Sequence, residues 1–125
     1  MARKILVAED DPNIVLSLEF LLRTAGHDVT IAADGAAALA LAESLRPDLL
    51  LLDVMLPAVD GFEVCRRIRQ NHLTRDTKIL MLTARGRESE MKKGLATGAD
   101  AYITKPFGTR ELMDTVAALL GPTPS

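Results

Sequence analysis

The chain has 125 residues, a formal net charge of −2, and 48% hydrophobic and 26% charged residues. This length suits one folded domain, and the charge balance provides no general attraction to nucleic acid or to an anionic membrane. Aromatic residues make up only 3% of the chain and tryptophan is absent, so a base-stacking platform for single strands is not expected. The single cysteine, Cys65, cannot form an internal disulfide.

Short apolar runs alternate along the chain with longer amphipathic segments. The runs are rich in leucine and β-branched residues, which is typical of strands buried on both faces. We predict strands over Lys4–Ala8, Asp28–Ala32, Leu49–Asp53, Lys78–Thr83 and Ala101–Thr104. The segments between them place apolar side chains at helical spacing. We predict helices over Pro12–Ala25, Gly35–Leu45, Gly61–Asn71, Arg87–Thr97 and Thr109–Leu120.

This strict alternation predicts an α/β fold, a three-layer doubly wound five-stranded parallel sheet with helices on both faces. The flavodoxin-like strand order 2-1-3-4-5 is the leading topology, although periodicity alone does not determine the order. We expect residues 1–120 to form this domain and residues 121–125 to be a linker or tail. No apolar stretch approaches the about 20 residues of a membrane helix, so we expect a cytoplasmic protein that does not bind membranes.

Three carboxylates follow strands that should be neighbours in this order. Glu9 and Asp10 come directly after the first strand, and Asp53 ends the third. Each alone is typical of a solvated acid, but together they favour a site for a hard divalent cation such as Mg²⁺. Asp10 and Asp53 are the expected direct ligands, with Glu9 acting through water.

A hydroxyl and an ammonium group should project over the same edge of the sheet. Thr83 ends the fourth predicted strand, and Lys105 follows the fifth. Beside a carboxylate and a metal ion, these two groups are suited to neutralise and position a phosphoryl group. Asp53 is then the candidate nucleophile, forming an acyl phosphate.

With these residues in place, the chain resembles the receiver domains of bacterial response regulators from Lys4 to Leu120. The matching stretches are Ile5–Pro12 (ILVAEDDP), Leu51–Gly61 (LLDVMLPAVDG), Met81–Ala84 (MLTA), Gly98–Asp100 (GAD) and Tyr102–Phe107 (YITKPF). The run Met81–Gly86 and the segment through Phe107 are most similar to the branch of the family that carries winged-helix transcription factors.

The resemblance implies a signalling domain of a two-component system, with no enzyme activity beyond its own phosphorylation and dephosphorylation. Asp53 would accept a phosphoryl group from a sensor histidine kinase or phosphotransfer protein. Mg²⁺ would be held by Glu9, Asp10, Asp53 and the backbone carbonyl of Met55. Lys105 would pair with the phosphoryl oxygens, and its bond to Pro106 would be cis.

The resemblance also implies a conformational switch and a phosphoryl group whose lifetime is set by neighbouring side chains. Thr83 would move toward the phosphoryl group and Tyr102 would follow it inward, which would change the surface formed by residues 87–120 for an unknown downstream effector. No direct contact with nucleic acid is expected. Met55 and Arg85 stand where the family controls access of water to the acyl phosphate, and neither positions water well, so we expect a long-lived phosphoryl group.

Three other interpretations compete with this one. A degenerate receiver, acting as a phosphorylation-independent interaction module, would be expected to lack an acid, Thr83 or Lys105, and none is missing. A flavodoxin-type cofactor carrier would need a phosphate-binding loop where Glu9, Asp10 and Asp11 stand. An aspartate-based phosphatase would need a second acid two residues after Asp53, where this chain has Met55.

Overall fold

The computed structural model describes residues 2–84 and 88–121. Its strands form one parallel sheet in the order β2-β1-β3-β4-β5, as predicted. They are β1 (Lys4–Ala8), β2 (Asp28–Ala32), β3 (Leu49–Asp53), β4 (Lys78–Ala84) and β5 (Ala101–Lys105). The helices are α1 (Pro12–Thr24), α2 (Gly35–Leu45), α3 (Gly61–Gln70), α4 (Glu88–Thr97) and α5 (Thr109–Leu120).

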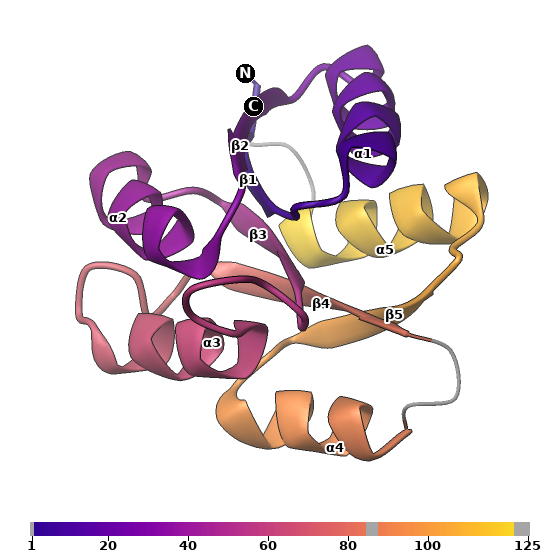
Figure 1. The fold of residues 1–125 in the computed structure, drawn as a ribbon. Helices are drawn as coiled ribbons and strands as arrows, with labels where there is room; N and C mark the ends of the chain where they lie inside the picture. Colours follow the sequence, from indigo (N-terminus) through magenta and orange to yellow (C-terminus); the bar gives the residue numbers. More distant parts are fainter. Residues whose placement is uncertain (1, 85–87, 122–125) are drawn as a thin grey trace.

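The helices cover both faces of the sheet and complete the predicted three layers. Figure 1 shows α2, α3 and α4 on one face, and α1 and α5 on the other. Successive strand residues point to opposite faces. Leu50 and Leu52 therefore pack in the core below α2 and α3, whereas Leu49 and Leu51 pack below α1 and α5.

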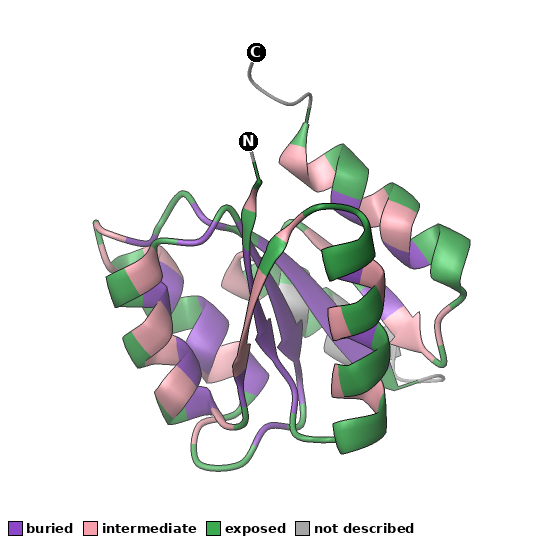
Figure 2. Cartoon of the chain, turned by 90° about the horizontal axis from the view of Figure 1, so that it is seen from above, coloured by how far each residue is buried: buried purple, intermediate pink, exposed green. Residues whose placement is uncertain are grey.

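The centre of the sheet is the most deeply buried part of the chain. All residues of β3 are buried, and Figure 2 shows the inner strands as a continuous buried layer between exposed helix faces. The parallel register aligns the carboxyl ends of the strands, pairing Ala8 with Leu52 and Thr83 with Thr104. Side chains at the ends of β1, β3, β4 and β5 are consequently brought to one edge.

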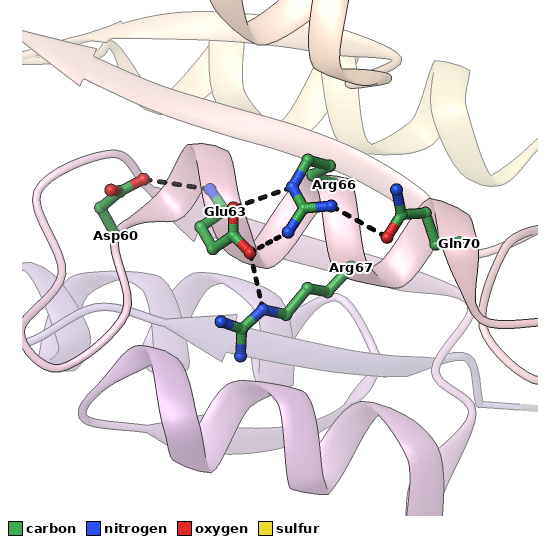
Figure 3. Close-up of polar contacts among 5 residues, drawn as sticks. All are labelled: Asp60, Glu63, Arg66, Arg67 and Gln70. Atoms are coloured by element: carbon green, nitrogen blue, oxygen red, sulfur yellow. Dashed lines mark hydrogen bonds and ion pairs between the residues drawn. The ribbon is translucent and has the colours of Figure 1, made fainter.

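Aspartates begin three of the helices that leave this edge. The side chains of Asp11, Asp34 and Asp60 accept hydrogen bonds from backbone amides at the starts of α1, α2 and α3. Figure 3 shows this cap for Asp60, which accepts from the Glu63 amide at 3.0 Å. A side-chain cap satisfies one of the amides that a helix start leaves unpaired, so each loop is held where it enters its helix.

The element bounds differ slightly from the prediction. β4 and β5 each continue one residue further, to Ala84 and Lys105, while α1 and α3 each end one residue earlier. The predicted start of the fourth helix at Arg87 lies outside the described residues. Within residues 2–84 and 88–121, no helix combines the length and apolar composition needed to cross a membrane.

Candidate functional site

Three carboxylates meet at the carboxyl edge of the sheet. β1 lies beside β3, so Glu9 and Asp10, which follow β1, face Asp53 at the end of β3. Oxygen atoms of the three groups all lie within 4.8 Å of one another. Glu9 and Asp53 are buried, with 1% and 5% of their surface exposed, whereas Asp10 is exposed. The structure therefore brings together the acids that the sequence singled out.

Lys105 reaches this cluster from β5. Its Nζ lies 2.6 Å from Glu9 Oε1 and 3.2 Å from Asp53 Oδ1. Glu9 Oε1 has no well-aligned hydrogen bond within the described part of the chain, so its contact with Lys105 is an ion pair. The peptide bond from Lys105 to Pro106 is cis.

Burial and charge act in opposite directions on these groups. Burial raises the pKa of Glu9, against the lowering effects of Lys105 and of the Asp11 amide. Burial alone would lower the pKa of Lys105, but Glu9 and Asp53 outweigh it and raise that pKa. The ammonium group of Lys105 therefore stays charged at neutral pH, as a partner for anions requires.

Glu9 also organises the loop that follows β1. Its second carboxylate oxygen, Oε2, accepts hydrogen bonds from the amides of Asp10 at 3.0 Å and Asp11 at 3.2 Å. This buried acid thus uses one oxygen for the loop backbone and the other for Lys105. The sequence assigned Glu9 to the metal site, through water from the residue pattern and as a ligand from the resemblance; its contacts with the loop backbone and with Lys105 were not foreseen.

The loop from Val54 to Asp60 forms the other side of the site. The Met55 amide donates to Asp53 Oδ1 at 3.3 Å, and the Gly61 amide donates to the Val54 carbonyl at 2.9 Å. The Met55 side chain is 67% exposed. The loop therefore holds the Asp53 carboxylate through the Met55 backbone while the Met55 side chain stays in solvent.

The two predicted switch residues occupy different environments. Thr83, on β4, is 1% exposed, and its hydroxyl has no hydrogen-bond partner among the residues described. Tyr102, on β5, is 41% exposed and pairs in register with Met81 rather than with Thr83. A buried polar group without a partner is rare in folded proteins, so the Thr83 hydroxyl is a candidate for contact with a ligand.

The donor set suits a hard divalent cation. Three carboxylates face one ammonium group in the described residues, so negative charge at the cluster is left uncompensated. Clustered carboxylates repel one another, and Mg²⁺ prefers oxygen ligands of this kind. The residues present therefore fit the metal ion that their pattern implied.

A groove of about 390 Å³ opens beside Lys105, and sequence reasoning did not foresee it. It lies between α1 and the segment after β5, and is lined by Asn13, Ile14, Ser17, Ala84, Pro106 and Phe107. Two large apolar side chains on α1, Leu16 and Phe20, are also 65% and 69% exposed. Only folding brings α1 and residues 105–107 together, so no local sequence signal marks this groove.

Comparison with known proteins gives relatives over nearly the whole chain. The chain is 49% identical over 120 residues to the alkaline phosphatase synthesis transcriptional regulatory protein PhoP of Bacillus subtilis, covering 96% of this chain and 49% of PhoP. It is 51% identical over 121 residues to the phosphate regulon transcriptional regulatory protein PhoB of Rhizobium meliloti, covering 96% of this chain and 53% of PhoB. The chain spans about half the length of these curated relatives.

Solved structures of receiver domains agree with this chain in fold. The receiver domain of the sensor histidine kinase PA1611 from Pseudomonas aeruginosa, with a magnesium ion coordinated in its active-site cleft, matches with a TM-score of 0.90 and 34% identity. That match covers 98% of this chain and all of the other. The chemotaxis response regulator CheY4 of Vibrio cholerae matches with a TM-score of 0.89 and 34% identity, covering 95% and 99%.

The family model for the response regulator receiver domain matches residues 5–117. This span includes β2 to β5, all of β1 except Lys4, and every residue of the candidate site. The chain therefore belongs to the response regulator receiver domains of two-component signalling.

Proposed function

We propose that Asp53 is the phosphoacceptor of this receiver, and that its donor is a sensor histidine kinase or a phosphotransfer protein. The observation that carries this proposal is the position of Asp53 at the end of the central strand, with its Oδ1 3.2 Å from Lys105 Nζ. In the proposed reaction an Asp53 oxygen forms a bond to phosphorus as the bond from phosphorus to the donor imidazole nitrogen breaks. The leaving electron pair goes to that nitrogen.

The surrounding side chains supply charge and position for this transfer. Lys105 would neutralise a phosphoryl oxygen, and the unpartnered Thr83 hydroxyl would donate a hydrogen bond to another. Glu9, Asp10, Asp53 and the backbone carbonyl of Met55 would hold Mg²⁺. When bound, the cation would offset the charge that accumulates between the carboxylates and the phosphoryl oxygens.

The output of the switch would appear on the surface formed by α4, β5 and α5. Movement of Thr83 toward the phosphoryl group would leave space behind it, into which Tyr102 would turn from its 41% exposed position. Such a local charge event can bias an element with two stable arrangements. We propose that this change controls an effector that carries out the output, in transcription as for the named relatives, without direct nucleic-acid contact by this domain.

The phosphodonor is proposed to approach over α1. The groove beside Lys105 includes Ile14, Pro106 and Phe107 in its lining, and the exposed Leu16 and Phe20 lie one turn apart on the same helix, α1. Large exposed apolar side chains that lie together are characteristic of protein interaction sites.

Residues 1–120 would form this phosphorylated unit and residues 121–125 a linker or tail; all of the tail except Gly121 lies outside the described residues.

The proposal is tested by phosphorylation in solution. The protein is treated with acetyl phosphate and MgCl₂, and its intact mass is compared with that of an Asp53→Asn variant. We expect one phosphoryl group on the wild type and none on the variant. When a chelator is present during the treatment, we expect none on either protein. No gain on the wild type, or a gain that persists in the variant, would instead favour a phosphorylation-independent interaction module.

A second prediction concerns the lifetime of the phosphoryl group. Met55 is exposed beside Asp53 and offers no polar atom that positions water, so we expect hydrolysis to take minutes or longer. Replacing Met55→Glu should shorten the lifetime several-fold, measured by the decay of the phosphorylated mass in Mg²⁺ buffer. Loss within seconds from the wild type would contradict this expectation. Arg85, the other residue predicted to control access of water, lies outside the described residues.

A further inference from the structure

The turn between β2 and α2 contacts both loops of the candidate site, although it contributes no side chain to it. On one side, the Ala32 carbonyl accepts a hydrogen bond from the Glu9 amide at 3.1 Å. On the other side, the Gly35 amide donates to the Pro57 carbonyl at 3.1 Å. The turn thus joins the loop that carries Glu9 and Asp10 to the loop that carries Met55.

At Gly35 this contact leaves no room for a side chain. A β-carbon there would lie 1.9 Å from the carbonyl oxygen of Val59 and 2.7 Å from its β-carbon. The nearest atom belongs to the backbone, so it cannot move aside by a change of rotamer. Either the loop or the start of α2 would have to shift.

The start of α2 is held in place. The Asp34 carboxylate caps it by accepting from the Ala37 amide at 2.7 Å, and Ala38 and Ala42 are fully buried in the core. A shift of α2 would therefore disturb packing along the whole helix. In the loop, Val54 and Leu56 are also buried, but residues 57, 58 and 60 are exposed. Displacement of this exposed part of the loop is the less costly response to a larger residue at Gly35.

The far end of that loop is also closely packed. A β-carbon at Gly61 would lie 2.4 Å from the Asp53 carbonyl oxygen, and the Gly61 amide donates to the Val54 carbonyl. The loop is therefore braced at its end by α3 and in its middle by α2. Along the chain, Met55 lies between Asp53 and these supports.

We propose that Gly35 is a positioning residue, and that the β2–α2 turn sets the separation between the loop of Glu9 and Asp10 and the loop of Met55. This proposal rests on the proposed function, because it takes those two loops to hold Mg²⁺. The separation matters more for Mg²⁺ than for Ca²⁺. Mg²⁺ demands short, near-ideal ligand distances, whereas Ca²⁺ accepts longer distances and irregular geometry.

The test measures metal affinity by ¹H–¹⁵N chemical-shift titration with MgCl₂ and with CaCl₂, which reports on folded molecules only. For Gly35→Ala we expect Mg²⁺ affinity to fall about 10- to 100-fold, the usual cost of removing an outer support of a metal site. Ca²⁺ affinity should fall much less, so the preference for Mg²⁺ over Ca²⁺ should decrease.

The matched control is Ala36→Gly, at the exposed neighbouring position of the same helix. It lowers helix propensity by about 1 kcal/mol without bringing any atom toward the loop. We expect it to leave both metal affinities unchanged. Equal losses for Mg²⁺ and Ca²⁺ in Gly35→Ala, or an unchanged Mg²⁺ affinity, would overturn the proposal.

A second measurement uses only the wild type, in case Gly35→Ala fails to fold. Mg²⁺ should slow hydrogen exchange of the Gly35 amide more than that of the Gly121 amide, which is bonded to Ala117 in α5. Equal slowing of the two amides would count against the inference while leaving the metal site intact. Failure of the wild type to bind Mg²⁺ at all would overturn the proposed function as well.

Discussion

Two polar clusters of this receiver differ in how completely their hydrogen-bonding groups are satisfied. The first, the Arg69 junction, consists of Arg69, Arg75, Thr77, Gly98 and Asp100. The Arg69 guanidinium donates to the carbonyls of Gly98 at 2.8 Å, Arg75 at 2.8 Å and Thr77 at 2.6 Å. It also pairs with the Asp100 carboxylate at 2.7 Å, which accepts in addition from the Ile79 amide.

The second, the acidic site, consists of Glu9, Asp10, Asp53, Thr83 and Lys105. Here three carboxylates face one ammonium group, and the Thr83 hydroxyl is unpartnered among the described residues. Buried polar groups are normally paired, because an unpaired one loses its hydration without replacement. The saturated cluster joins the α3–β4 and α4–β5 connections and acts structurally, whereas the unsaturated one leaves polar groups available to a ligand.

The largest expected effect comes from breaking the saturated cluster. Arg69→Ala should lower the free energy of unfolding by about 3 kcal/mol, since it removes four hydrogen bonds and leaves the Asp100 carboxylate without its cation. Urea denaturation followed by circular dichroism measures this change. Phosphorylation of the folded variant by acetyl phosphate should persist.

A neighbouring arginine provides the matched control. Arg67 lies on the same helix but pairs with Glu63 at the surface, with about half of its side chain exposed (51%). Arg67→Ala should therefore cost less than about 1 kcal/mol. Equal effects of the two substitutions would contradict the structural role assigned to the Arg69 junction.

An intermediate effect is expected from two buried threonines in opposite situations. The Thr74 hydroxyl donates to the Ile68 carbonyl at 2.9 Å, whereas that of Thr83 has no partner in the described chain. In metal-free buffer, Thr74→Val should lower the free energy of unfolding by about 1 kcal/mol and Thr83→Val should raise it by about as much. Thermal denaturation with a chelator present tests the difference in sign.

The Thr83→Val result bears directly on the comparison. If this substitution destabilised the protein as much as Thr74→Val, the Thr83 hydroxyl would have a structural partner, and the acidic site would no longer count as unsatisfied. If Thr83→Val made the fold more stable but abolished the conformational change on phosphorylation, the unpaired hydroxyl of Thr83 would be kept for function at a cost in stability.

The architecture and the main site residues could be predicted because their signals are local. Buried leucine runs such as Leu49–Asp53 have strand character on their own, and an acid at the end of a strand projects to a known edge of a parallel sheet. Periodicity alone did not determine the strand order, which was the leading topology for such an alternation and was supported by the resemblance. Lys105 was expected just after its strand and is instead its last residue.

Long-range packing accounts for what was not predicted. Arg69 is one of several arginines on an amphipathic helix, and nothing local distinguishes it from Arg66 or Arg67. Its carbonyl partners belong to two separate connections that meet only in the folded chain. The sequence around Gly35 likewise shows only a glycine at the start of a helix. Its close contact with Val59 exists only in the folded chain.

The smallest expected effect on stability concerns a cluster on the surface of α3 whose polar groups are paired but exposed. Glu63 pairs with Arg66 and Arg67, and Arg66 also contacts Gln70, as Figure 3 shows. Hydrogen bonds from the two arginines lower the pKa of Glu63 to about 2. Because the folded-state pKa lies below the ordinary value of 4.5, this group contributes stability above that value and loses its contribution as the pH falls from 4.5 toward 2.

Glu63→Gln should therefore reduce the steepness of the acid-induced loss of stability in that window and change little at neutral pH. Solvent screening keeps the effect small, since both arginines are about half exposed (48% and 51%). Denaturation at a series of pH values, with the wild type alongside, measures the difference in slope. A large loss of stability at neutral pH would show that the paired groups around Glu63 stabilise the fold even though they are exposed. Burial would then no longer explain why Arg69 contributes more to stability than the arginines that pair with Glu63.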